Sequence, residues 1–269
     1  MIGIPGRRIG PCIWLALQAT AASAHAGTGL PGGIAQGFAH PFGGLDHLLA
    51  MVSVGLWGAF LGRPLIYALP VIFPVVMVVG AALGMFGVPL PRVEAGVALS
   101  VLVLGAAVAT AWRAPVIVAS FVVALFAMFH GYAHGRELPS AADPIGYSVG
   151  FVLATGLLHL VGVAIGAVAR GSRATGFVRA LGVAIACAGL AFLAEAAREG
   201  MSLDVAIAVP LLVAAPVAAA VTLFARRLAA ARRLVAPKVL AAWLIAVALL
   251  ATLLQFVSVT PGYLPDHLE

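Results

Sequence analysis

The chain has 269 residues, of which 63% are hydrophobic and only 9% charged, and its mean hydropathy is +1.14. A soluble domain of this length needs more charge on its surface, so the composition predicts an integral membrane protein. The formal net charge is +6, but the arginines stand singly or in pairs between apolar runs, which argues against a nucleic-acid-binding protein.

Residues 1–26 have the three parts of a secretory signal peptide. Arg7 and Arg8 precede an apolar stretch at 9–22, and small residues that suit cleavage follow at 22–26. The alternative is an uncleaved first span, because the apolar stretch is short. In either case the chain from residue 27 onward is expected to begin outside the cytoplasm.

The rest of the chain is predicted to be all-α, a polytopic transmembrane helical bundle of about eight spans. Each apolar run is near the 20 residues that a helix needs to cross a bilayer, and backbone groups in lipid must pair within the segment. The runs are 43–61, 65–87, 93–111, 115–133, 145–169, 177–194, 205–225 and 239–258. We expect a six-span core over residues 27–195, and two additional spans with a short acidic external tail over residues 196–269.

The charges between these runs predict the orientation. Threading from an external residue 27 leaves only basic residues in the internal loops, as the positive-inside rule requires. These residues are Arg63, Arg113, Arg170, Arg173, Arg179, Arg226, Arg227, Arg232, Arg233 and Lys238. The opposite side receives most of the acidic residues and would concentrate cations. The expected location is the bacterial inner membrane, with the mature N terminus and the C terminus on the periplasmic side.

The first of two histidine motifs is H-P-F-G-G-L-D-H, residues 40–47. Pro41 suits the opening position of a helix, which would leave His40 as its cap. If the helix continues, His40 and His47 are about two turns apart and face the same way, with Asp46 beside them. Asp46 can ligate a cation or fix the tautomer of a ligating histidine. The alternative is an Asp and His pair that only satisfies two buried polar groups.

The second motif is F-H-G-Y-A-H-G-R-E, residues 129–137. His130 and His134 are four residues apart, so both imidazoles lie on one helix face and can share an ion. Glu137 follows within a turn and can add a carboxylate. Ionisable groups in apolar spans are functional candidates because hydrocarbon solvates them poorly. The two motifs together therefore predict a metal site.

Two further histidines are weaker candidates. His159 lies about mid-depth in the fifth run, one turn from Thr155, and is either a ligand or a hydrogen-bonding group between helices. If the signal is cleaved after Ala24, His25 presents a free α-amine beside its imidazole and can attract metal outside the membrane.

Imidazole and carboxylate donors favour borderline divalent ions over Ca²⁺ or Mg²⁺, and they do not separate nickel from cobalt or zinc. Cys12 lies in the signal and Cys187 is alone in the mature chain, which argues against thiolate ligation.

These residues resemble the HupE/UreJ family of bacterial nickel and cobalt permeases. The family pattern of His, five residues and Asp-His is met at 40–47, and F-H-G-x-A-H-G-x-E is met at 129–137. Residues 150–159, G-F-V-L-A-T-G-L-L-H, also look like the family. The resemblance covers about residues 25–195. It implies a transporter for Ni²⁺ or, next, Co²⁺, which supplies metal to enzymes such as hydrogenase or urease.

A permease is therefore the leading hypothesis, with the metal ion as cargo and no permanently bound cofactor. The residues leave two alternatives open: an intramembrane metal-dependent hydrolase with Glu137 as base, and an electron-transfer protein with haem held by histidines. The expected partners are the lipid bilayer and the metal ion, and the sequence also allows a homo-oligomer.

Overall fold

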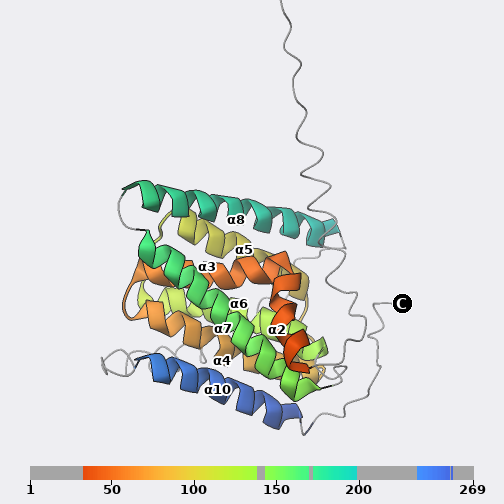
Figure 1. The fold of residues 1–269 in the computed structure, drawn as a ribbon. Helices are drawn as coiled ribbons and strands as arrows, with labels where there is room; N and C mark the ends of the chain where they lie inside the picture. The colour runs from red at the N-terminus through yellow and green to blue at the C-terminus, as the bar shows by residue number, and fades with distance from the viewer. Residues whose placement is uncertain (1–32, 138–142, 170–171, 199–234, 255, 257–269) are drawn as a thin grey trace, which may run out of the picture.

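The computed structural model describes residues 33–137, 143–169, 172–198, 235–254 and 256, and every element among them is an α-helix. The signal segment, the run at 205–225 and the acidic tail lie outside the described residues. The helices lie side by side, with α8 and α10 on opposite sides of the bundle (Figure 1). They are α2 (Gly33–Gly43), α3 (Leu45–Leu61), α4 (Leu65–Met85), α5 (Val93–Ala109), α6 (Val116–Glu137), α7 (Pro144–Val168), α8 (Ser172–Arg198) and α10 (Val235–Leu254).

Four of these helices, α4, α6, α7 and α8, are long and apolar enough to cross a membrane. The bent pair of α2 and α3 gives up to five spans among the described residues, fewer than the eight predicted. The predicted span at 93–111 is a shorter apolar helix, α5, which begins after Arg92 in the left-handed conformation (φ 61°) and ends at Ala109. The count of eight spans stays a prediction.

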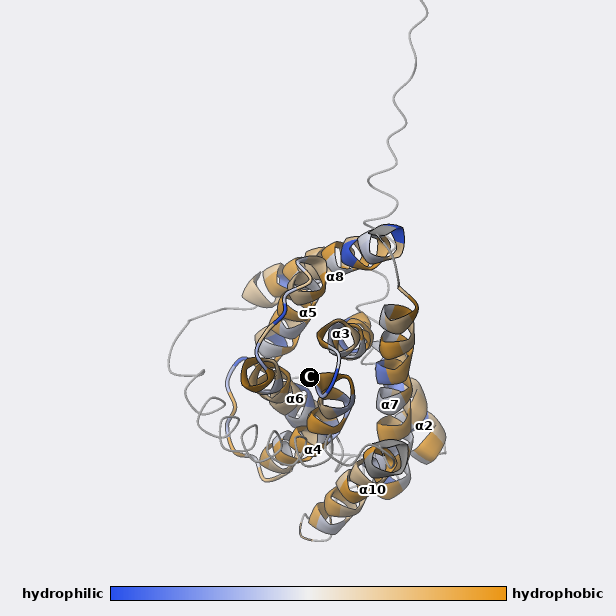
Figure 2. Ribbon diagram, turned by 90° about the vertical axis from the view of Figure 1, so that its left-hand side faces the viewer, coloured by the Kyte–Doolittle hydropathy of each residue, from blue (hydrophilic) through white to orange (hydrophobic). Residues whose placement is uncertain are grey.

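Helix α3 lies in the middle of the bundle, with α4, α5 and α7 packed against it (Figure 2). Its residues from Ala50 to Gly58 are nearly all buried, and Met51 belongs to the main hydrophobic core. Figure 2 also shows apolar residues around most of each helix, the pattern of helices that are buried or face lipid.

Glycines bring the helices into backbone contact. A Cβ added at Gly80 or Gly84 of α4 would overlap with the backbone of α6, and one added at Gly150 or Gly162 of α7 would overlap with α2 or α3. These small residues therefore let the helices approach closely, as in other transmembrane bundles. Close approach of α4 to α6, and of α7 to α2 and α3, gathers the histidine-bearing segments at one end of the bundle.

Candidate metal centre

Four imidazoles from three helices meet at this end of the bundle. His40 lies in the last turn of α2, His47 in the first turn of α3, and His130 and His134 one turn apart near the end of α6. The ring centroid of His47 lies 4.7 Å from that of His134 and 4.8 Å from that of His130. The centroid of His40 lies 4.8 Å from that of His134 and 6.3 Å from that of His47. We call these four side chains the histidine cluster.

The first motif folds differently from the prediction. Pro41 lies inside α2 and does not open a helix, so His40 is in a last turn and is not a cap. The chain bends by 84° between α2 and α3 at Gly44, whose backbone is extended (φ −105°, ψ 117°). The glycine pair Gly43 and Gly44 favours this break, because glycine supports a continuing helix poorly. His40 and His47 meet across the bend, not along one straight helix.

Asp46 orients His47. The Nδ1–H of His47 donates to Asp46 Oδ1 over 2.8 Å, and the backbone N–H of His47 donates to the same oxygen. Both side chains are partly buried, with 15% of His47 and 30% of Asp46 exposed. With Nδ1 protonated, the lone pair of the ring is on Nε2, the nitrogen that can bind a metal.

Ser100 of α5 orients His130 through a hydrogen bond, a role that the sequence analysis missed. The Ser100 hydroxyl donates to the carbonyl of Val97 over 2.6 Å, so its oxygen can accept from His130 Nε2–H at 2.9 Å. His130 is fully buried, and its Nδ1 has no hydrogen-bond partner among the described residues. A buried nitrogen lone pair without a donor is what a cation ligand needs. No spacing in the sequence links residues 100 and 130.

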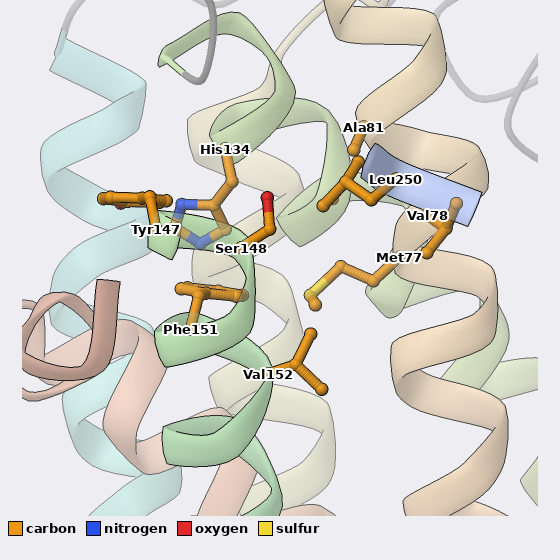
Figure 3. Close-up of a pocket in the computed structure, with 10 residues that line it drawn as sticks. Met77, Val78, Ala81, His134, Tyr147, Ser148, Phe151, Val152 and Leu250 are labelled. Atoms are coloured by element: carbon orange, nitrogen blue, oxygen red, sulfur yellow. The ribbon is translucent and has the colours of Figure 1, made fainter. Parts of the chain in front are cut away.

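Two aromatic side chains of α7, Tyr147 and Phe151, lie beside His134 (Figure 3). The ring of Phe151 lies 4.3 Å from that of His134, and the ring of Tyr147 lies 5.6 Å from that of His40. A cavity of about 20 Å³, large enough for about one water molecule, lies beside His134 between α4, α6, α7 and α10. The surroundings are therefore mostly apolar, which strengthens electrostatic attraction between a cation and its ligands.

His159 lies apart from the cluster and deeper in the bundle, at the sixteenth of the 25 residues of α7. It is fully buried, and neither ring nitrogen has a hydrogen-bond partner in the described part of the chain. The ring of Phe73 stands between the two sites, 5.6 Å from His130 and 5.1 Å from His159. Thr155, one turn away on α7, is also buried with an unpartnered hydroxyl among those residues.

Two other predicted ligands lie at or beyond the edge of the described residues. Glu137 is the last residue of α6, but its side chain is not among those described, and His25 lies outside the described residues. Across the part of the chain that is described, no three His, Cys, Asp or Glu side chains are arranged to hold one metal ion in common. The rings of the cluster contact one another edge to face at 61–86°, which is packing of imidazole on imidazole and not an arrangement of several nitrogens around one point.

The glycines of the second motif also have a structural reason. Gly131 and Gly135 each follow a histidine, and a Cβ at either would overlap with the backbone of α4 at Met77 or Ala81. The face of α6 next to the histidines is therefore pressed against α4. The motif combines the candidate ligands His130 and His134 with the helix contact that fixes their position.

The fold and this cluster define a class: a helical membrane protein with imidazoles gathered within its apolar core. The sequence model of the family described as HupE / UreJ protein matches residues 13–192, and the chain belongs to this family. Protein HupE of Rhizobium leguminosarum bv. viciae is 43% identical to it over 180 residues, which cover 66% of this chain and 94% of that protein. No solved structure matches the chain.

Proposed function

We propose that this protein is an integral membrane permease for a divalent transition-metal ion, with Ni²⁺ preferred and Co²⁺ next. The metal would serve the maturation of metalloenzymes such as hydrogenase or urease. The observation that carries the proposal is the histidine cluster, in which four imidazoles from separate parts of the chain meet within the apolar bundle. Ionisable groups held there mark the path of an ion. Family membership supports the same function.

In the proposed path, the cation loses part of its water at the histidine cluster and passes Phe73 to reach His159. Conduction requires binding strong enough for entry and weak enough for release. Among the described residues the imidazoles do not already surround one point, which suits an exchangeable site and not a closed structural site whose ligands are in place. Glu137 and His25 remain proposed ligands at the entrance.

We propose that the cluster faces the periplasm in the bacterial inner membrane. Arg63 follows α3, and Arg113 precedes α6, so both lie at the bundle end away from the cluster. Glu94 begins α5 and Asp143 caps α7, at the same end as the cluster. The asymmetry agrees with the positive-inside rule and gives the entrance an excess of negative charge.

The alternatives have less support. Haem ligation needs two imidazoles on opposite faces of a planar ring, whereas the cluster imidazoles contact one another edge to face. A hydrolase needs room for a substrate beside the metal, and the cavity at His134 has a volume of about 20 Å³.

The test is uptake of radiolabelled nickel and cobalt by cells that lack other importers, with zinc and copper as competitors. We expect uptake that depends on expression of this chain and saturates with metal, with more nickel than cobalt taken up at equal concentration. Cells that express Leu157→Ala, a change at an exposed apolar position of α7, are the matched positive control. Uptake equal to that of cells without the protein would overturn the proposal.

A further inference from the structure

Helix α10 lies outside the residues that the family sequence model matches, which end at residue 192. It nevertheless packs against α4 and α7 of the core (Figures 1 and 2). One stripe of α10 is buried, with Ala246 at 0% and Leu250 at 5% exposure, while Leu244 on the other side is 60% exposed. Leu250 lines the cavity beside His134 (Figure 3). The helix is thus docked beside the candidate site.

The contact that fixes α10 is made by Trp243. Its indole Nε1–H donates to the backbone carbonyl of Pro70 in α4 over 2.8 Å, and the bond is buried. Four residues further along α4 stands Pro74, which has no N–H to offer that carbonyl. Trp243 therefore supplies the donor that the helix itself lacks. Gly156 of α7 makes room for the indole, because a Cβ there would overlap with the ring.

This contact lies close in the chain to Phe73, whose ring stands between the two histidine sites. Phe73 directly precedes Pro74, and its ring touches both His130 and His159. The conformation of α4 at Pro70 and Pro74 therefore sets where the Phe73 ring stands. A buried carbonyl with its hydrogen bond made has one preferred orientation, whereas an unsatisfied one favours local rearrangement.

We propose that Trp243 of α10 is a positioning residue for translocation: by bonding the Pro70 carbonyl that Pro74 leaves unsatisfied, it holds α4 so that Phe73 stays between His130 and His159. Helix α10 then takes part in transport together with the core helices. The effect of Trp243 on the uptake rate rests on the proposed transport function.

The test uses the full chain with Trp243→Phe, which keeps an aromatic ring against Gly156 and removes the N–H. We expect the maximal uptake rate per inserted protein to fall about fivefold, the equivalent of about 1 kcal/mol. The half-saturating metal concentration should change by less than about twofold, because the histidine cluster is untouched. Leu244→Ala is the matched control on the exposed side of α10 and should transport normally.

Pro74→Ala provides the decisive background, because this substitution restores a backbone N–H four residues after Pro70. In that background Trp243→Phe should have little further effect, so the two changes should be strongly non-additive. A wild-type rate for Trp243→Phe would overturn the proposal. So would an equal fivefold loss in the Pro74→Ala background, or a loss that only follows the amount of inserted protein.

Hydrogen exchange on purified protein separates this inference from the transport proposal. Trp243→Phe should speed amide exchange in α4 after Pro70 but not in α5, whether or not any metal moves. Absence of uptake by the wild type would reject the transport function alone. Unchanged exchange in α4 would reject the role of Trp243.

Discussion

The histidine-bearing helices and the α5–α8 pair are built by the same packing device but differ in chemistry. Gly131 and Gly135 bring α6 against α4, and Gly105 and Gly189 bring α5 against α8. Yet α8 leaves large apolar side chains such as Phe177 exposed, and from α5 the Ser100 hydroxyl reaches an imidazole. Glycine contacts therefore give architecture in both regions. A site arises only where they also bring oriented imidazoles together.

The largest effect should come from removing a histidine of the cluster or the Asp46 carboxylate that orients one of them. His47→Ala, Asp46→Asn, His130→Ala and His134→Ala should each lower metal uptake by about 100-fold or more, at least as much as losing an orienting partner. Membrane insertion should be unchanged. As the control from the α5–α8 pair, Cys187→Ala at an exposed position of α8 should leave uptake unchanged. Normal uptake by all four cluster variants would show that the cluster is only structural.

Ser100→Ala should have the next largest effect, because it frees the ring of His130 to change tautomer and orientation. We expect metal affinity to fall about 10- to 100-fold, as for other orienting partners of metal ligands. Ser100→Thr keeps the hydroxyl and should recover most of the affinity, which calorimetry on purified protein would measure. Equal affinities for the alanine and threonine variants would mean that Ser100 serves packing alone.

External acid should weaken uptake in the wild type. A proton and a metal compete for the same imidazole lone pair, so binding is favoured at neutral pH and lost as the histidines become charged. Initial rates should fall once external pH drops below about 6, by about tenfold at pH 5. The cytoplasmic pH and membrane potential are clamped as the control. A flat rate between pH 7 and 5 would count against imidazole ligation.

The smallest effect tests the glycine contacts of the two regions directly. Gly131→Ala and Gly189→Ala both place a methyl group against the backbone of a neighbouring helix, so both should lower thermal stability. Only Gly131→Ala should also shift the half-saturating metal concentration, by about threefold, because it moves the ring of the adjacent His130. Equal shifts for both variants would mean that the regions do not differ as described.

The sequence predicted much of this arrangement. Long apolar runs predicted α4, α6 and α7 because hydrocarbon leaves the backbone no other way to pair. The spacing of His130 and His134 predicted a shared face because the helix period is fixed. Hydrogen bonds across helices are different: the contacts of Ser100 with His130 and of Trp243 with Pro70 join residues 30 and 173 positions apart. Local periodicity carries no information about such pairs.

The bend in the first span shows the same limit at short range. Apolar composition favours one helix through residues 43–61, with Pro41 suited to an opening position. In the structure Pro41 is accommodated within α2, which ends at Gly43. The chain breaks at Gly44, and α3 begins at Leu45. His40 and His47 lie near each other, with ring centroids 6.3 Å apart, but they meet across the bend and not along one helix face as predicted.

The break at Gly44 has an electrostatic consequence. The last turn of α2, with His40 in it, ends at the exposed residues Phe42 and Gly43, and the first turn of α3, with His47 in it, begins at Leu45. The last carbonyl groups of one helix and the first N–H groups of the next have no partners within their own helices, so poles of opposite sign lie side by side at the bend. The break therefore leaves main-chain donors and acceptors beside His40 and His47 that an uninterrupted helix would have paired with one another.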